Sequence, residues 1–173
     1  ISFGGSDIRD LTPVALRALN QITDRDLHVR VVAGQGFGVD AVRNLQREVL
    51  VARHTCEIIV SPDSLYEHMA WCDIALTNTG LTKYELAVTG TPSLQISIDD
   101  AHDEINRPYV DKGAAEYLGV YSGVDDSMIR DSLLELLDNT CKRRRMSREG
   151  CSLVDGLGTD RVIDEILALD VAV

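Results

Sequence analysis

The chain has 173 residues, which is the length of a single domain or of one domain with a small appendage. Its 28 Asp and Glu residues outnumber its 17 Lys and Arg residues, and the formal net charge of −11 opposes non-specific binding to nucleic acid or to anionic lipid. No apolar run approaches the roughly 20 residues that span a bilayer, and no leader of basic and then apolar residues opens the chain, so we expect neither a membrane span nor a signal peptide.

Short runs of β-prone residues alternate with runs of helical character along the whole chain. The expected strands cover residues 1–3, 27–33, 56–60, 73–77, 93–98 and 117–121. Thr12 followed by Pro13 predicts the start of the first helix, with the threonine as its N-cap. Further helices are expected around residues 42–49, 64–71, 82–88, 129–137 and 162–169.

Strands separated by single helices are typical of an α/β fold with a parallel sheet covered by helices on both faces. The favoured topology is a doubly wound, six-stranded, Rossmann-like sheet with the strand order 3-2-1-4-5-6. In this order a ligand binds beyond the carboxyl ends of the first and fourth strands. The loops after Phe3 and after Thr77 are therefore the expected site.

The chain opens directly in the first expected strand, without Met. We therefore expect residues 1–173 to be one domain, the C-terminal half of a two-domain protein whose N-terminal domain is missing here. The four cysteines are widely spaced and form no CxxC pair, and Cys56 and Cys72 lie in apolar stretches. This pattern favours structural thiols in a reducing, cytoplasmic compartment.

Gly4, Gly5 and Ser6 form the first candidate loop. Two glycines allow a ligand to approach the backbone, and the start of the following helix offers N–H groups to an anion such as a diphosphate. A tight turn that simply needs glycine explains the same residues equally well. The glycines of residues 34–38 follow the second strand, where we interpret them as turn residues near the cleft.

The second candidate loop comprises Thr79, Gly80, Leu81 and Thr82 and leads to Glu85. Thr82 and Glu85 have the spacing of a capping box, in which both side chains satisfy backbone donors. Alternatively, the amides of the loop face a phosphate, and the Glu85 carboxylate accepts two hydrogen bonds from a ribose diol. The sequence leaves both interpretations open.

An acidic segment at residues 99–104 surrounds His102 and is followed by Asn106. The favoured interpretation is a solvated acidic loop, and the alternatives are a divalent-metal site or a contact of His102 or Asn106 with a bound sugar or phosphate. The basic run at residues 141–148 is expected to close a helix and to interact with its negative end. No pair of nucleophile and base can be assembled from the chain, so the catalytic residues stay unknown, and no metal or cofactor is expected.

At this point several motifs, in their order and spacing, resemble the nucleotide-sugar-binding half of GT-B glycosyltransferases. They are Gly4-Gly5-Ser6-Asp7, Cys72-Asp73-Ile74-Ala75, the residues from Gly80 to Ala87, Gly90-Thr91-Pro92, His102 with Asn106, and Lys112-Gly113-Ala114-Ala115. Tyr84 before Glu85, and the turn Asp155-Gly156-Leu157-Gly158 followed by Arg161-Val162, are similar to one branch of this family. That branch contains a UDP-sugar hydrolase of the pseudaminic acid pathway and predicted glycosyltransferases of spore-coat polysaccharide synthesis.

The resemblance implies a Rossmann-like C-terminal domain that binds UDP or a similar nucleotide diphosphate. Gly4, Gly5 and Ser6 would approach the phosphates, the segment from Thr79 to Thr82 would supply donors, Glu85 would hold the ribose, and His102 and Asn106 would contact the sugar. The implied activity is glycosyl transfer from a UDP-sugar in surface polysaccharide or sugar biosynthesis. The alternatives are a UDP-sugar hydrolase and a non-catalytic sugar-nucleotide-binding module that needs a partner subunit. Asp103 departs from the glutamine that peptidoglycan members of the family often carry, and its carboxylate would repel a diphosphate unless turned away, protonated or bridged by a cation.

Overall fold

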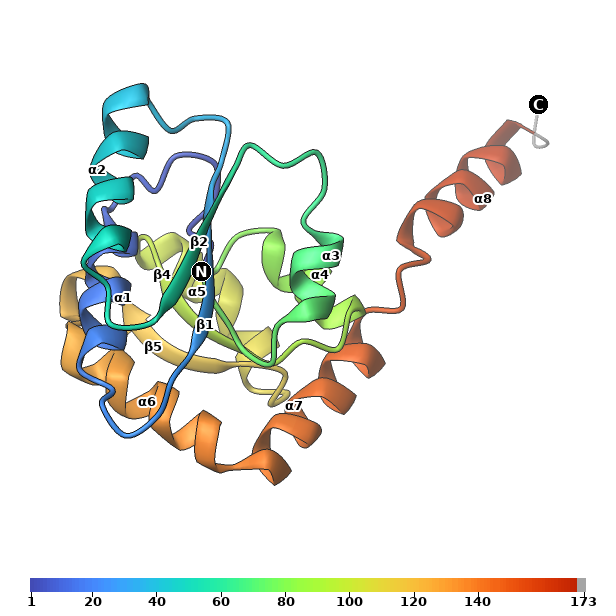
Figure 1. The fold of residues 1–173 in the computed structure, drawn as a ribbon. Helices are drawn as coiled ribbons and strands as arrows, with labels where there is room; N and C mark the ends of the chain where they lie inside the picture. Colours follow the sequence, from blue (N-terminus) through green and yellow to red (C-terminus); the bar gives the residue numbers. More distant parts are fainter. Residues whose placement is uncertain (171–173) are drawn as a thin grey trace.

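The computed structural model describes residues 1–170, which form an α/β fold of parallel sheets flanked by helices (Figure 1). The strands are β1 (His28–Ala33), β2 (Thr55–Val60), β3 (Ala75–Asn78), β4 (Ser93–Ser97) and β5 (Glu116–Val120). The helices are α1 (Leu11–Asn20), α2 (Val39–Leu50), α3 (Tyr66–Trp71), α4 (Thr82–Val88), α5 (Asp100–Val110), α6 (Asp126–Asp138), α7 (Thr140–Leu153) and α8 (Gly158–Asp170). The predicted α/β class and parallel strands are confirmed.

The expected single sheet of six strands is not confirmed, because the five strands form two sheets of order β1-β2 and β3-β4-β5. Residues 1–3, the predicted first strand, make only a single parallel bridge between Ser2 and Thr77. The segment nevertheless bonds to both sheets: the Ile1 amino group donates to the Arg30 carbonyl at 2.7 Å, and the Ser2 N–H donates to the Leu76 carbonyl at 2.9 Å.

Strand β4 is buried along its whole length, and its two faces differ in chemistry. Leu94 and Ile96 join the main apolar core, which also contains residues of α1 and α6. Because side chains alternate along a strand, Ser93, Gln95 and Ser97 point to the opposite face. On that face the sheet is covered by α5, whose Asp103 accepts a hydrogen bond from Tyr117 in β5. Helices therefore cover both faces of this sheet, as predicted.

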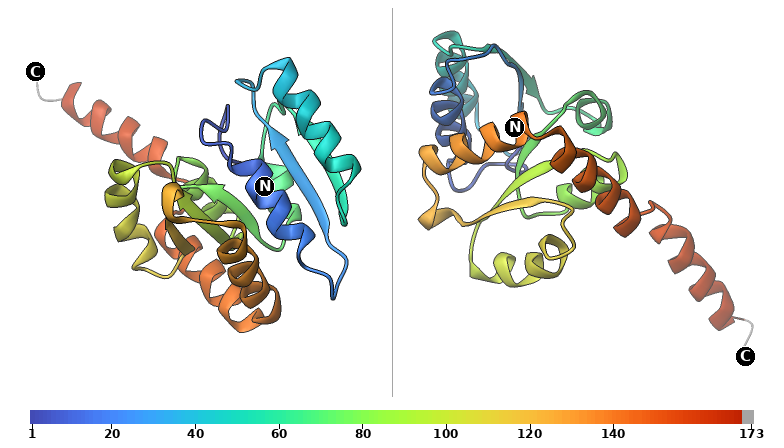
Figure 2. Two further views of the ribbon diagram at one scale, coloured as in Figure 1. Left: turned by 90° about the vertical axis from the view of Figure 1, so that its left-hand side faces the viewer. Right: turned by 90° about the horizontal axis from the view of Figure 1, so that it is seen from below.

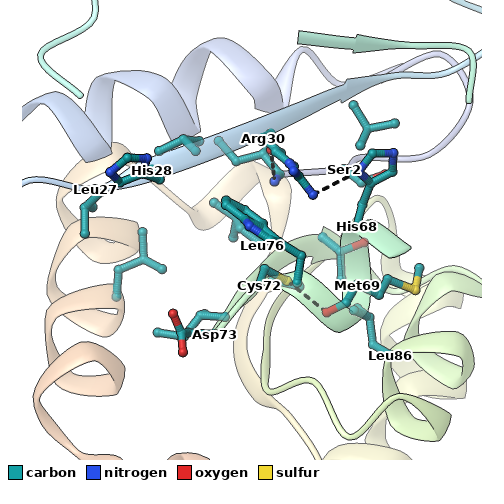
Figure 3. A pocket seen from close by; sticks show the side chains of 18 of the residues that line it. Ser2, Leu27, His28, Arg30, His68, Met69, Cys72, Asp73, Leu76 and Leu86 are labelled. Carbon is teal, nitrogen blue, oxygen red and sulfur yellow. Dashed lines mark hydrogen bonds between the residues drawn. The ribbon is translucent and has the colours of Figure 1, made fainter. Parts of the chain in front are cut away.

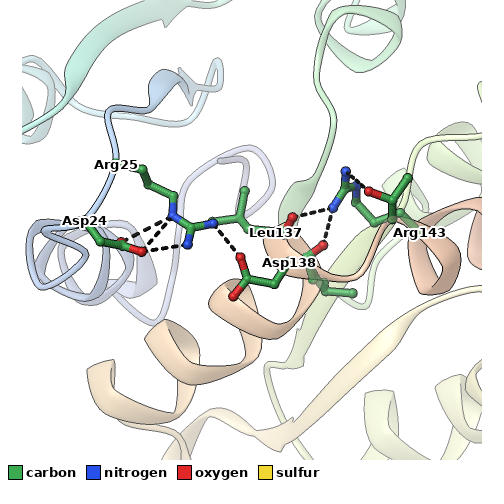
Figure 4. Close-up of polar contacts among 7 residues, drawn as sticks. Asp24, Arg25, Leu137, Asp138 and Arg143 are labelled. Atoms are coloured by element: carbon green, nitrogen blue, oxygen red, sulfur yellow. Dashed lines mark hydrogen bonds and ion pairs between the residues drawn. The ribbon is translucent and has the colours of Figure 1, made fainter.

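Helices α6 and α7 are joined by a short corner that arginine side chains stabilise (Figure 4). Arg143 donates to the carbonyl groups of Leu136 and Leu137 at the end of α6, where the last carbonyls have no partner within the helix. Arg25, before β1, pairs with Asp24 at 2.6 Å and with Asp138 at 2.8 Å. The prediction that the basic run closes a helix is wrong, because the run lies in the first half of α7. The predicted interaction with a negative helix end is made by Arg143, but with the end of the preceding helix, α6.

Helix α8 is the last described element, and it projects away from the rest of the fold (Figures 1 and 2). The turn before it is fixed by Asp155, which accepts from the Leu157 N–H at 3.0 Å and pairs with Arg161. These bonds lower the pKa of Asp155 to about 2. Gly156 has a φ of +77°, a backbone conformation that glycine adopts readily, so this motif forms a structural turn before α8. Within residues 1–170, no helix combines the length and the apolar character needed to cross a lipid bilayer.

Candidate functional site

The two predicted loops meet at Asn78, the last residue of β3. A Cβ atom placed on Gly4, whose φ is +81°, would lie 3.3 Å from the Asn78 Nδ2 atom. A Cβ atom placed on Gly80 would lie 3.4 Å from the Asn78 Oδ1 atom. The Asn78 amide therefore lies between the two turns, and both turns flank the carboxyl ends of β3 and of residues 1–3. This is the arrangement that the predicted strand order requires for a shared ligand.

The first turn also packs closely against the glycine-rich segment after β1. The Gly36 N–H donates to the Gly5 carbonyl at 2.8 Å, and a Cβ atom on Gly34 would lie 2.7 Å from the Gly5 Cα atom. A Cβ atom on Gly36 would lie 2.9 Å from the Ser6 Cβ atom. The interpretation of these glycines as turn residues is supported, since any side chain at Gly34 would push the first turn out of place.

The amides at the start of α1 already have a partner. The buried Asp7 carboxylate accepts from the N–H of Leu11 at 2.9 Å and from the N–H of Thr12 at 2.7 Å. The prediction that Thr12 caps this helix is wrong, because the helix begins at Leu11 and Thr12 lies in its first turn. The expectation that an anion would use this helix start is also wrong for these two amides. Any anion at the first turn must bind the exposed backbone of Gly5 and Ser6 instead.

The second loop is shaped by the burial of Thr79 and by the start of α4. The Thr79 hydroxyl shares a hydrogen bond of 3.1 Å with the Ser97 hydroxyl, so this side chain faces the interior. Helix α4 begins at Thr82, its N-cap position is Leu81, and no side chain caps it. The capping-box interpretation of Thr82 and Glu85 is therefore wrong, and the Glu85 carboxylate is exposed.

Glu85 lines a groove of about 440 Å³ on the outer side of α4. The opposite wall comes from the loop between β2 and α3, which turns at Ser61 with a φ of +46°. The lining residues are Pro62, Asp63, Ser64, Leu65, Tyr66, Met69, Glu85, Val88 and Thr89. Sequence reasoning missed the segment from Pro62 to Tyr66, and its position at the carboxyl end of β2 is the signal that could have found it.

The acidic segment is not a solvated loop, because it forms the start of α5. Asp99 is the N-cap of α5 and accepts from the His102 N–H at 2.8 Å and from the His102 Nδ1 atom at 2.7 Å. These bonds to His102 lower the pKa of Asp99. The imidazole is therefore held through Nδ1, and its Nε2 atom points away from Asp99. No group of three or more His, Cys, Asp and Glu side chains that could hold a metal ion occurs within residues 1–170.

Asp103, which departs from the family pattern, is turned toward positive charge. Its carboxylate accepts from the Tyr117 hydroxyl at 2.5 Å and pairs with Arg107 at 2.7 Å. The hydrogen bond from Tyr117 and the pair with Arg107 lower the pKa of Asp103. Burial and the Asp103 partner raise the pKa of Tyr117 to about 12. The repulsion expected between this carboxylate and a diphosphate is therefore reduced by a neutralising neighbour.

Asn106 is fully buried and faces α4. Its Oδ1 atom accepts from the Lys83 Nζ atom at 3.1 Å, and Lys83 is itself only 2% exposed. The pair joins α4 to α5, and in this structure the Asn106 side chain does not reach the surface near the two turns. A direct contact between Asn106 and a bound sugar stays a prediction that would require the side chain to move.

A larger cavity, of about 560 Å³, lies elsewhere, between β1 and the residues that lead into β3 (Figure 3). Of the predicted site residues only Thr82 lines it, together with the residues of α3 and of the amino ends of β1 and β3. The two glycine turns and Glu85 do not. This cavity adjoins the groove beside α4, because Leu65 and Met69 line both.

Comparisons with known proteins support the same fold. No protein-family profile matches the chain. The spore coat polysaccharide biosynthesis protein SpsG of Bacillus subtilis is 25% identical over 163 residues, which is 94% of this chain and 47% of SpsG. The chain thus spans about half the length of this curated relative.

Among solved structures, MurG of Acinetobacter baumannii has a TM-score of 0.76 at 20% identity, with 97% of this chain and 48% of MurG covered. HepE of Anabaena, solved in complex with UDP-glucose, has a TM-score of 0.72 at 16% identity, with 96% of this chain and 47% of HepE covered. The calicheamicin glycosyltransferase CalG4 has a TM-score of 0.65 at 18% identity, covering 96% of this chain and 40% of CalG4. These likenesses show that this chain has the fold of a domain of GT-B glycosyltransferases.

Proposed function

We propose that the chain is the UDP-sugar-binding domain of a GT-B type glycosyltransferase that acts in surface polysaccharide or sugar biosynthesis. The observation that carries the proposal is the convergence of the Gly4 and Gly80 turns on Asn78. At Asn78, two backbone turns from distant parts of the chain lie side by side at the edge of the sheet. The identity to SpsG supports the assignment to polysaccharide biosynthesis.

In the proposed complex the nucleoside occupies the groove beside α4. The exposed Glu85 carboxylate is an acceptor-only group, which suits the two hydroxyl donors of a ribose. The backbone of Asp63, Ser64 and Leu65 lies on the opposite wall, where its polar groups can pair with the edge of a base.

The diphosphate is proposed to lie between the Gly4–Ser6 turn and the Thr79–Leu81 turn, where backbone N–H groups donate to its oxygens. The His102 ring, held through Nδ1 by Asp99, would present Nε2 to the sugar or the adjacent phosphate. Stabilisation of the departing diphosphate by fixed donors is the catalytic contribution of this domain. The general base and the acceptor site would belong to the missing N-terminal domain.

Calorimetric titration of UDP, GDP and CDP tests the ligand. We expect UDP to bind most tightly and Glu85→Gln to weaken UDP binding by about 1–3 kcal/mol, or roughly 5- to 150-fold, because a charged hydrogen bond to the ribose is lost. Glu104→Gln is the matched control, since Glu104 is also an exposed glutamate but lies on α5 outside the groove. Equal UDP affinity of the wild type and a folded Glu85→Gln variant would remove Glu85 from the site.

Turnover by the full-length protein distinguishes the proposed transferase from the alternatives. We expect UDP release from a UDP-sugar to require an acceptor, and the isolated domain to show no turnover. UDP release at the same rate without an acceptor would identify a hydrolase. UDP-sugar binding without release of UDP in either assay would leave a non-catalytic binding module that needs a partner subunit.

A further inference from the structure

Lys83 of α4 is a buried cation, and the partners that it has within residues 1–170 are neutral. The residue is 2% exposed, and no ion pair in this part of the chain includes it. Its Nζ atom donates to the Asn106 Oδ1 atom at 3.1 Å and lies beside the rings of Tyr84 and Tyr109. An ammonium group inside a protein is costly unless an anion compensates its charge.

Asn106 adds a second group that lacks an acceptor. Its Nδ2 atom is buried, and no atom of residues 1–170 accepts a hydrogen bond from it. The Lys83 ammonium has three N–H donors, of which Asn106 accepts one. Lys83 and Asn106 therefore form a buried group with a net positive charge and with more donors than acceptors. The field of such a group attracts an anion.

Lys83 follows directly on one of the two turns to which the proposed function assigns the diphosphate. Helix α4 begins at Thr82, and the Lys83 N–H donates to the Gly80 carbonyl at 3.4 Å. The Cα–Cβ bonds of a helix are tilted toward its start, so the Lys83 side chain leaves the backbone in the direction of this turn. The turn itself, Thr79 to Leu81, contains no lysine or arginine, and neither does the turn from Gly4 to Ser6.

The acceptor of the ammonium leads to the other side of the proposed site. Asn106 lies four residues after His102 on α5, and four residues of a helix rise about 6 Å. Lys83 thus connects α4 with α5 about one helical turn from the residue that is proposed to face the sugar or the adjacent phosphate. Because Lys83 is almost fully buried, little water screens its charge. At an effective dielectric constant of about 20, opposite charges about 10 Å apart change an affinity roughly tenfold.

We propose that Lys83 determines the specificity of the site for charged ligands: its buried ammonium is the counter-charge of the diphosphate and favours UDP over the uncharged nucleoside without contacting either. The inference rests on the proposed function, because that function places the diphosphate between the two turns, and it adds the residue whose charge selects the diphosphate. Binding of the anion recovers part of the free energy that the empty protein loses by burying Lys83. Lys83 therefore lowers the stability of the empty protein and raises its affinity for an anionic ligand.

The test is a series of titrations with uridine, UMP and UDP on the full-length protein and on its Lys83→Met variant, followed by NMR chemical shifts so that weak binding is also measured. Methionine keeps the length of the lysine side chain without the charge. We expect Lys83→Met to weaken UDP binding at least about tenfold, to weaken UMP binding less, and to leave uridine binding within about twofold of the wild type. An effect of charge grows with the charge of the ligand, whereas damage to the packing of the site weakens binding of all three ligands alike.

Two control variants are measured with the same ligands. Lys112→Met removes the same charge from an exposed position after α5, at the end of this helix opposite to His102. It is expected to leave all three affinities unchanged, because water and salt screen an exposed charge. Glu85→Gln is expected to weaken uridine and UDP binding by the same factor, since both ligands carry the ribose.

A measurement on the wild type covers the case in which Lys83→Met does not fold. The protonation of Lys83 is followed through the NMR signal of its Cε atom as the pH is raised. Saturating UDP is expected to raise the pKa of Lys83 by about 1, and saturating uridine to leave it unchanged, because a tenfold coupling acts equally on the proton and on the ligand. Burial lowers this pKa in the empty protein, and within residues 1–170 the titratable groups that face Nζ are Tyr84 of α4 and Tyr109 of α5. Burial raises the pKa of Tyr109 to about 12, above the range of this titration.

Three results would overturn the inference: an equal UDP affinity of the wild type and Lys83→Met, an equal loss of uridine and UDP affinity in Lys83→Met, or an unchanged pKa of Lys83 in the UDP complex. In each of these cases the wild type still binds UDP, so the proposed function stands. Absence of UDP binding by the wild type would instead contradict the proposed function, and the inference would fail with it.

Discussion

The least expected residue is Lys83, a buried cation with no carboxylate partner among residues 1–170. Its Nζ atom donates to Asn106 and lies 5.1 Å from the Tyr84 ring centroid and 5.7 Å from that of Tyr109. The Tyr109 hydroxyl donates to the Lys83 carbonyl at 3.0 Å, so the main chain is held as well. Ring faces and one amide oxygen offset only part of the cost of removing an ammonium group from water.

Replacing Lys83 with an uncharged side chain of similar length separates the effect of its charge on stability from the effect of its packing. Burial lowers the pKa of Lys83 below 10.5, so the unfolded chain binds the proton more tightly than the folded chain. The free energy of unfolding of the wild type is therefore expected to rise as the pH increases toward 10.5 and the folded state no longer has to bury the charge. Lys83→Met, which keeps the length of the side chain, is expected to abolish this rise in chemical denaturation measured from pH 7 to pH 10.

Asn106→Ala is the complementary change, because it leaves the Lys83 ammonium without its acceptor. We expect it to lower the free energy of unfolding at pH 7 by about 1–3 kcal/mol, the cost of a buried donor without a partner. Lys83→Met combined with Asn106→Ala is expected to recover part of this loss. An alkaline stability profile of Lys83→Met that matched the wild type would show that Lys83 is not the group responsible.

At the scale of elements, α1 depends on a capping residue that precedes it by several positions. Asp7 has a φ of +45° and accepts from the amides of both Leu11 and Thr12. Asp7→Ala is expected to lower the free energy of unfolding by about 1–2 kcal/mol, since two helix-start donors lose their acceptor and alanine is disfavoured at positive φ. Asp7→Asn keeps one acceptor oxygen and tolerates this backbone, so it is expected to cost less than half as much.

Asp10→Ala provides the control in the same measurements. Asp10 also has a positive φ, of +50°, but makes no capping hydrogen bond. Its replacement reports the cost of backbone strain alone. If Asp7→Ala and Asp10→Ala destabilised the protein equally, the hydrogen bonds from Asp7 would contribute nothing to α1.

The elements that the sequence predicted correctly are those with a strong local signal. The alternation of apolar strands and helices placed the Gly4 and Gly80 turns on the same edge of the sheet, and the structure brings both to Asn78. Helix α5 was missed because Asp99 and the acidic residues after it resemble a solvated loop, and because Pro108 lies inside the helix. Asp99 is a typical N-cap residue and so a signal for a helix start, but the many acidic residues after it favoured the interpretation as a solvated loop.

The contacts that sequence could not predict are those between residues far apart in the chain. The family resemblance implies a contact between Asn106 and the sugar, yet in the structure Asn106 bonds to Lys83, which lies 23 positions earlier. The groove wall at Asp63 approaches Glu85 because the chain turns at Ser61. The run Ser61-Pro62-Asp63-Ser64 indicates a turn, but it does not specify which distant residue the turn will face. The capping-box interpretation of Glu85 failed because α4 begins at Thr82 itself, and a shift of one or two residues at a helix start is beyond what sequence patterns resolve.

At the scale of the whole molecule, stability resides in the two sheets and in the helices packed on them. Gly150 of α7 packs so closely on α4 that a Cβ atom there would lie 3.3 Å from the Ala87 Cα atom. Val154, just after α7, packs against the cluster that contains Ala87 and Tyr109. The packed part of the molecule thus extends to Val154, and α8 lies beyond it (Figure 2).

Helix α8 exposes an apolar stripe, formed by Val162, Ile163, Ile166, Leu167 and Leu169. Ile166 is 56% exposed and Leu169 is 73% exposed, so their burial contributes little to the stability of the isolated chain.

Ending the chain after Val154 is therefore expected to change Tm by less than about 2 °C and to leave UDP affinity unchanged. The same truncation is expected to reduce concentration-dependent self-association in sedimentation experiments, because it removes α8 together with its exposed apolar stripe. Ile166→Asp in the intact chain tests the stripe without shortening the protein and is expected to reduce self-association equally. A fall in Tm of more than about 5 °C on truncation would show instead that α8 packs on the domain in solution.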